Sequence, residues 1–171
     1  MINGAFGVGK TTVANGLLTH IPNSMLYDPE EVGQMLKKVT AGVRLADEGT
    51  GDFQDIALWP ALSVDVAERL YNRCKRPLII PMTLDVPYFT VFKNGLSRVD
   101  PNLYHFCLTA SKEVIHQRLA QRGDEPGSWT FQQTERCVAA HRDPIFSEHI
   151  DSEDIDSQQI QEYILSRIQP T

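Results

Sequence analysis

The stretch Gly4-Ala5-Phe6-Gly7-Val8-Gly9-Lys10-Thr11 stands near the start of the chain and decides its fold class. It matches the pattern G-x-x-x-x-G-K-[ST] at every fixed position. Glycines let a backbone wrap closely around phosphate oxygens with its N–H groups pointing inward, and the helix that follows adds the positive end of its dipole. The pattern therefore predicts a phosphate-binding loop between a strand and a helix.

The residues of this loop have separate expected roles. Lys10 is a point charge for the β- and γ-phosphates of ATP, and the Thr11 hydroxyl is a ligand for Mg²⁺. The alternative interpretation is a glycine-rich turn with a surface lysine. The residues predicted to bind the nucleotide are Gly4, Ala5, Phe6, Gly7, Val8, Gly9, Lys10, Thr11 and Thr12.

Strand and helix patterns alternate along the rest of the chain. Residues 77–84 form an almost wholly apolar run, which is typical of a strand buried on both faces. Other segments show the apolar spacing of helices. The expected helices are 11–21, 29–39, 53–74 with a kink at Pro60, 87–99, 112–122, 130–142 and 157–168, and the expected strands are 1–3, 24–28, 77–84, 103–110 and 148–151.

This alternation predicts a single domain over residues 1–171, an α/β protein of the three-layer α/β/α P-loop NTPase type with a five-stranded parallel sheet. Ligands of such a sheet bind at the carboxyl ends of its strands. The glycine-rich stretch 40–52 is expected to form a loop over the site. Residues 1–3 are fewer than the roughly five of a typical strand, so we expect a short first strand or a chain that begins before this numbering.

Composition and charge narrow the function classes. The formal net charge is −6 and the pI is about 5.3, and no basic stripe indicates a nucleic-acid partner. No apolar run approaches the roughly 20 residues that span a bilayer. The cysteines Cys74, Cys107 and Cys137 show neither disulfide nor metal spacing, which suits reduced thiols in the cytoplasm.

An aspartate stands at the carboxyl end of the second predicted strand. In Asp28-Pro29-Glu30-Glu31, Asp28 has the position of a helix N-cap, and Pro29 that of the first helical residue. A carboxylate beside a phosphate loop is also a candidate base, or orienting group, for an acceptor hydroxyl. Both roles are compatible, and capping is expected to lower the pKa of Asp28 and keep it ionised.

Arginines late in the chain fit the architecture of small nucleotide and metabolite kinases, which carry an arginine-bearing lid. Arg118 and Arg122 lie one turn apart on a predicted helix, and the expected lid covers approximately residues 118–142. Such arginines hold the charge of a transferring phosphoryl group. The alternative is that a nearby carboxylate, Asp124, Glu125 or Glu113, neutralises them.

Further candidates are expected on the acceptor side. Gln54 is a candidate for hydrogen bonds to a base edge, and Trp59 for an apolar contact with the substrate, although a surface glutamine and a core tryptophan are the alternatives. Arg136 is predicted to bind substrate. Asp85 is a candidate for supporting Mg²⁺, because the apolar run ends in Thr83 where many phosphate-loop proteins have an acidic residue. Trp129 is expected to stack on the nucleotide or to pack the closed lid.

The chain also resembles a known family through stretches that span nearly its whole length. These are INGAFGVGKT (2–11), YDPEEVG (27–33), DFQDIALW (52–59), LIIPMTL (78–84), ASKEVIHQRLAQR (110–122), ERCV (135–138) and PIFSEHI (144–150). They resemble the bacterial tunicamycin-resistance ATP-binding proteins, a group similar in architecture to nucleotide kinases and to chloramphenicol phosphotransferase. In these antibiotic kinases the proposed base stands at the place that Asp28 has here.

The resemblance implies an ATP- and Mg²⁺-dependent protein that protects against tunicamycin, a nucleoside antibiotic with a uridine head and a fatty-acyl tail. The favoured hypothesis is a kinase with an alcohol group as acceptor, in which Lys10, Asp28, Arg118 and Arg122 are catalytic. The partner would be the drug or a related nucleoside-like compound. One alternative is a non-catalytic protein that sequesters the drug, and another is a housekeeping nucleoside or nucleoside-monophosphate kinase.

Overall fold

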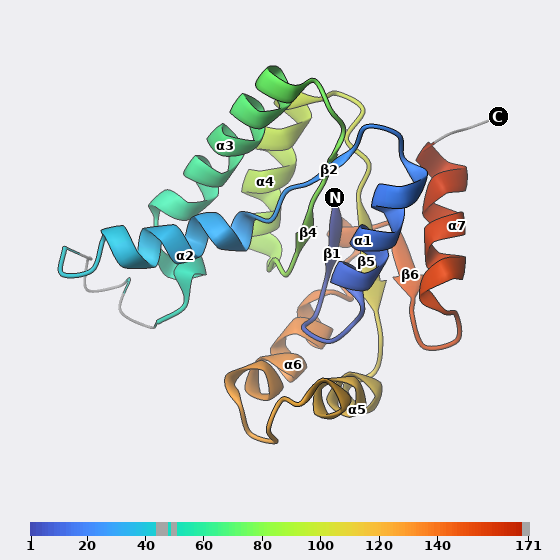
Figure 1. The fold of residues 1–171 in the computed structure, drawn as a ribbon. Coiled ribbons are helices and arrows are strands. Elements are labelled where there is room, and N and C mark those ends of the chain that lie inside the picture. The colour runs from blue at the N-terminus through green and yellow to red at the C-terminus, as the bar shows by residue number, and fades with distance from the viewer. Residues whose placement is uncertain (44–47, 49–50, 169–171) are drawn as a thin grey trace.

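The computed structural model describes residues 1–43, 48 and 51–168, which Figure 1 shows as a ribbon. Much of the loop expected at 40–52, namely 44–47 and 49–50, lies outside the described residues. The strands are β1 (Ile2–Gly4), β2 (Met25–Leu26), β3 (Leu78–Ile79), β4 (Pro81–Met82), β5 (Phe106–Thr109) and β6 (His149–Asp151). The helices are α1 (Lys10–His20), α2 (Pro29–Val39), α3 (Leu58–Cys74), α4 (Val86–Val99), α5 (Lys112–Arg122), α6 (Trp129–Ala140) and α7 (Ser157–Ile168), with short 3-10 helices η2 (Phe53–Asp55) and η3 (Pro144–Phe146).

The first strand lies inside a parallel sheet of four strands, in the order β4-β1-β5-β6. A separate parallel pair joins β2 to β3. The sequence prediction of an α/β fold with a parallel sheet is therefore confirmed, whereas the prediction of one five-stranded sheet is wrong for the described residues.

The split falls within the apolar run that was expected to be a single strand. The carbonyl of Ile79 accepts the N–H of Tyr27 at 2.9 Å, and the carbonyl of Ile80 accepts the N–H of Ile2 at 2.8 Å. The next bond toward β2 would need an N–H from Pro81, and proline has none. The run therefore pairs with β2 in its first half and with β1 in its second.

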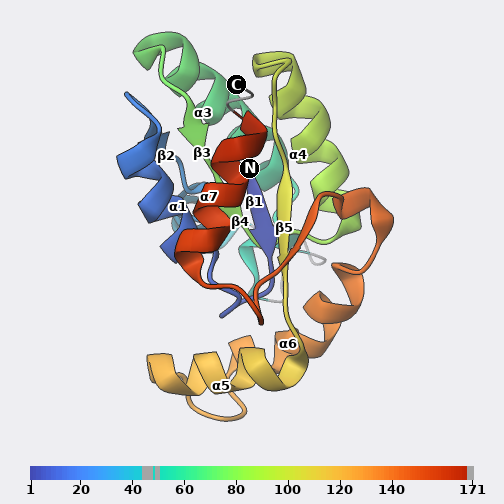
Figure 2. The same ribbon diagram turned by 90° about the vertical axis from the view of Figure 1, so that its right-hand side faces the viewer.

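Helices cover both faces of the four-stranded sheet. On one face Leu17 of α1 and Ile164 of α7 pack with Leu108 of β5, and Figure 2 shows α7 in front of the strands. On the other face Phe92 of α4 packs with Cys107, the neighbour of Leu108 whose side chain points the opposite way. Within the described residues, no helix is both long enough and apolar enough to cross a membrane.

The helix expected over residues 53–74 is interrupted, and it does not kink at Pro60. Its first part is the turn η2, which the Asp52 side chain caps by accepting the N–H of Gln54 at 3.0 Å. α3 then begins at Leu58. Pro60 therefore lies in the first turn of α3, where a missing N–H breaks no helical hydrogen bond.

α5 and α6 pack against each other beyond the phosphate loop, at the lower end of the molecule in Figure 1. A small buried cluster joins them to the loop: Ala5 contacts Ile115 and Leu119 of α5 and Cys137 of α6. The lid expected over approximately residues 118–142 corresponds to the end of α5, to α6 and to the connection between them.

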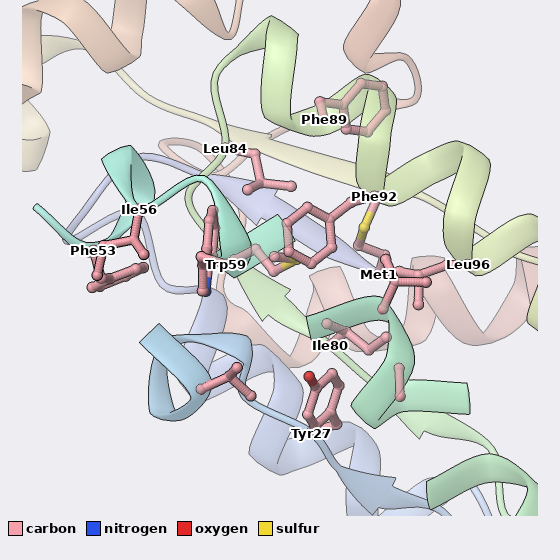
Figure 3. Packing of buried hydrophobic residues seen from close by; sticks show 14 of the residues in the cluster. Met1, Tyr27, Phe53, Ile56, Trp59, Ile80, Leu84, Phe89, Phe92 and Leu96 are labelled. Carbon is pink, nitrogen blue, oxygen red and sulfur yellow. The ribbon is translucent and has the colours of Figure 1, made fainter. Parts of the chain in front are cut away.

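Trp59 occupies the centre of the larger core cluster, as Figure 3 shows. Its side chain is fully buried, and its ring lies 5.1 Å from the rings of Phe53 and Phe92. The indole Nε1 donates a hydrogen bond to the carbonyl of Pro29 at 2.9 Å. Trp59 therefore fixes the first residue of α2 to the core, and it does so from α3.

Replacing this tryptophan tests the core. Trp59→Phe is expected to lower the free energy of unfolding by about 1–3 kcal/mol, because it removes a buried hydrogen-bond donor and leaves a gap. Urea unfolding followed by circular dichroism measures the loss. The matched control is Trp129→Phe, at the chain's exposed tryptophan, which is expected to stay within about 0.5 kcal/mol. Equal losses in the two variants would contradict this placement.

Candidate functional site

The predicted phosphate loop leaves β1 at Gly4 and reaches the first turn of α1 at Lys10. Gly4 has φ +149°, and a Cβ there would lie 2.6 Å from the carbonyl oxygen of Leu108. Gly9, the N-cap of α1, has a left-handed backbone with φ +107°. Two of the glycines that define the sequence pattern thus have steric reasons: close approach for Gly4 and backbone conformation for Gly9.

Lys10 points back over the loop. Its Nζ donates to the carbonyl oxygen of Ala5 at 2.8 Å and lies 5.7 Å from the centre of the Phe6 ring. Burial lowers the pKa of Lys10 to about 8, and the negative charge of Glu30 acts against this shift. A nearby anion would restore the charged form, so this lysine is suited to an anionic ligand.

One pocket of about 270 Å³ joins the loop to two other parts of the chain. Its lining residues are Phe6, Gly7, Gly9, Lys10, Thr11 and Thr12 from the loop and α1, Asp28 and Glu30 from the start of α2, Pro81 from β4, and Arg118 and Arg122 from α5. The four residues predicted to be catalytic therefore lie together, while their roles stay predictions. Gly4, Ala5 and Val8 are buried beneath the lining.

Asp28 is the N-cap of α2, as the sequence indicates. Its Oδ1 accepts the N–H of Glu30 at 2.9 Å, and Pro29 follows as the first helical residue. The side chain also lines the pocket. Burial raises the pKa of Asp28 by more than the cap hydrogen bond lowers it, so the expected lowering is wrong. A raised pKa makes this carboxylate a better proton acceptor than an ordinary helix cap.

Glu30 is a pocket residue that the sequence analysis did not single out. It reads as one of two acidic residues in the first turn of a helix, and Glu31 beside it is exposed. Glu30 is half-buried, and its pKa is raised first by burial and then by the charge of Asp28. One signal in the sequence could have identified Glu30. It lies two residues after Asp28, in the first turn of a helix that begins at the carboxyl end of a strand, where ligands of such a sheet bind.

Arg118 is held against the phosphate loop. Its Nη1 donates to Ser152 Oγ at 2.9 Å and to the carbonyl of Val8 at 3.3 Å, and its Nη2 donates to the carbonyl of Ser152 at 2.5 Å. None of these partners is a carboxylate, so the guanidinium keeps its positive charge uncompensated by a direct ion pair in the described residues.

Arg122 has a carboxylate partner. Its Nε lies 2.6 Å from Asp124 Oδ2, its Nη2 lies 3.0 Å from Oδ1, and Asp124 also accepts a hydrogen bond from Thr130 at 3.0 Å. The alternative that Asp124 neutralises an arginine therefore holds for Arg122 and not for Arg118. The Arg122 side chain is 56% exposed, so solvent weakens this ion pair and a phosphate can compete for it.

The first residue of α6 also contacts the loop. Trp129 stands edge-on to Phe6, with ring centroids 5.1 Å apart. Of the two expectations for Trp129, packing of the lid is the one that this contact matches. The ring is 45% exposed, so its other side is open to solvent.

Four acceptor-side candidates do not line this pocket. Trp59 is a core residue, and Gln54 is buried with its Nε2 donating to the carbonyl of Thr83 at 2.9 Å. Arg136 is exposed and forms a 2.5 Å ion pair with Asp85. The structure therefore does not bring Gln54, Trp59 or Arg136 to the pocket as substrate-binding residues, and for Trp59 the core alternative holds.

The oxygen atoms around the pocket fit a magnesium ion. Mg²⁺ prefers hard oxygen ligands, and the pocket offers the Thr11 hydroxyl as one such ligand. β4 leads instead to Thr83, whose buried hydroxyl has no hydrogen-bond partner in the part of the chain that the structure describes. Asp85 is held in an ion pair. The same part of the chain contains no group of three His, Cys, Asp or Glu residues placed to hold a metal ion, so phosphate oxygens would complete the coordination.

The parallel sheet and the glycine-rich loop at its first strand define an α/β protein whose fold is like that of kinases. A tunicamycin resistance protein from Deinococcus radiodurans has a similar structure, with a TM-score of 0.80 and 32% sequence identity over 99% of this chain and 94% of that one. The chain belongs to the tunicamycin resistance protein family.

Two other structures share the fold. A gluconokinase from Sinorhizobium meliloti 1021 superimposes with a TM-score of 0.64 and 19% identity, over 98% of this chain and 89% of that one. A sugar kinase from Janibacter sp. HTCC2649 superimposes with a TM-score of 0.64 and 22% identity, over 96% of this chain and 90% of that one. At these identities the likeness extends to the fold alone. No protein-family model and no curated protein matches the chain.

The lowered pKa of Lys10 can be measured by its reactivity. Only the uncharged amine is acylated, so acetic anhydride is expected to modify Lys10 with a midpoint near pH 8 in the folded protein. The same residue in the urea-unfolded chain is the control, with a midpoint of about 10.4. Peptide mass spectrometry measures the extent, and added ATP is expected to protect. A folded-state midpoint equal to the control would contradict the burial of this amine.

Proposed function

We propose that this protein protects against tunicamycin by transferring the γ-phosphoryl group of ATP to a hydroxyl of the drug. The pocket carries the proposal, because phosphate-binding groups and a carboxylate line the same space: Lys10, Arg118 and Arg122 with Asp28. The resistance named for the Deinococcus radiodurans protein supports the choice of drug. The fold, shared with two kinases, is compatible with the reaction.

At the donor end the chain supplies positive charge and N–H groups. The backbone of the loop and Lys10 bind the phosphate oxygens, with the N-terminus of α1 behind them. Arg118 is fixed beside the loop, and Arg122 would leave Asp124 for the transferring group. Thr11 would hold Mg²⁺ together with phosphate oxygens, whose charge the ion neutralises when bound.

At the acceptor end Asp28 orients the drug hydroxyl. The hydroxyl oxygen forms a bond to the γ-phosphorus while the bond from that phosphorus to the β–γ bridging oxygen breaks, and ADP leaves. Asp28 accepts the hydroxyl proton, a role that its raised pKa favours. Its other task, capping α2, uses Oδ1.

A second candidate function is ATP-dependent binding of the drug without transfer. Two observations favour it. β4 leads to Thr83 rather than to an acidic residue, and Arg122 is paired with Asp124. The first removes a negative charge that would support Mg²⁺, and the second occupies a positive charge that would stabilise the transferring phosphoryl group. Neither reduces the capacity to bind the drug.

The reaction can be tested directly with γ-labelled ATP, Mg²⁺ and tunicamycin. We expect the label on the drug. Drug binding without label would support the second candidate, and label on a nucleoside monophosphate alone would contradict both resistance functions.

The role of Asp28 has its own test. Asp28→Asn is expected to keep the fold and ATP binding, since asparagine also caps helices, and to reduce transfer by about 100-fold or more. Turnover is measured as labelled drug, with nucleotide binding and thermal unfolding as controls. Unchanged turnover would restrict Asp28 to capping.

A further inference from the structure

The pocket has two chemically opposite ends. All the cations among its described lining residues come from the loop, α1 and α5: Lys10, Arg118 and Arg122. Its carboxylates both come from the start of α2, Asp28 as the N-cap and Glu30 from the first turn. Because the cations hold the ATP phosphates in the proposed function, the acceptor has to approach from the side of the two carboxylates.

Glu30 lies in a mainly acidic neighbourhood. The charges that act on it are those of Asp28 and Glu31 from α2, Asp52 from the segment before η2, and Lys10 from α1. Lys10 is the one cation of this set. Once an ATP phosphate binds Lys10, an anion on the acceptor would meet like charges here.

The packing of α2 keeps these carboxylates in place. The indole of Trp59 holds the carbonyl of Pro29, which lies between Asp28 and Glu30. One turn later, a Cβ at Gly33 would lie 2.3 Å from the Phe53 ring, so the helix is in close contact with the core. The turn therefore has little freedom to swing away when an anionic acceptor arrives.

We propose that Glu30 is a specificity-determining residue that restricts the acceptor to compounds uncharged near the reacting hydroxyl and excludes phosphorylated ones. The inference rests on the proposed function and names its acceptor class. It separates this protein from nucleoside-monophosphate kinases, whose acceptor is a phosphate and needs cations, above all arginine, to hold it. Arg136, the arginine predicted from the sequence to bind substrate, forms an ion pair with Asp85 and does not line the pocket.

The test compares a nucleoside with its 5′-monophosphate. Uridine and UMP are titrated calorimetrically into the full chain with its phosphate loop saturated by Mg²⁺ and adenylyl-imidodiphosphate, which cannot transfer its terminal phosphate readily. Wild type is expected to bind UMP at least about tenfold more weakly than uridine, and Glu30→Gln to narrow this ratio at least about fivefold. Glu30→Asp, which keeps the charge, is expected to keep most of the discrimination.

The matched control is Glu31→Gln, the same charge change one residue along and on an exposed side chain; it is expected to leave the ratio unchanged. The inference is overturned if wild type binds UMP as tightly as uridine, if it binds neither, or if Glu30→Gln and Glu31→Gln behave alike. Because the measurement needs no turnover, its result is distinct from that of the labelling experiment. If uridine binds more tightly than UMP as expected but no label reaches the drug, phosphoryl transfer is contradicted and the selectivity of Glu30 is still supported.

Discussion

The close approach of Gly4 to the carbonyl of Leu108 is the constraint on which the site depends. It lets the chain leave β1 tightly against β5 and turn toward the start of α1. The strand itself is anchored on its other side, where Asn3 accepts the N–H of Leu84 at 2.8 Å and donates to the same residue's carbonyl at 3.3 Å. A three-residue strand is thus held on both sides, which compensates for its shortness.

The other half of the site depends on the core. Asp28 and Glu30 stand where they do because α3 fixes the start of α2 through Trp59 and Pro29. The residue that looked like a substrate contact therefore acts at a distance, through a backbone carbonyl. The aromatic core therefore holds the acidic end of the pocket in place, whereas the residues of the basic end come from the loop, α1 and α5.

The sequence was sufficient for features with local causes. The glycine pattern predicted the loop, and Asp28 with Pro29 predicted the start of α2. It was insufficient where partners far apart in the chain decide. The split of the sheet follows from which neighbours flank Pro81. The burial of Trp59 and the pocket position of Glu30 depend on how α2 and α3 pack. The sequence alone does not separate a glutamate that lines a pocket from an exposed one, or a core tryptophan from one that contacts a substrate.

The buried cluster that joins the loop to α5 and α6 has an entropic consequence. Ala5, Ile115, Leu119 and Cys137 are all fully enclosed, so α5 and α6 cannot swing as a free flap without exposing apolar surface. In the proposed function, rearrangement around the nucleotide would involve the short connection between them, residues 123–128, and side chains such as Arg122. Ordering a few residues costs little conformational entropy compared with ordering a whole lid. More of the free energy of the proposed nucleotide binding would therefore remain available as affinity.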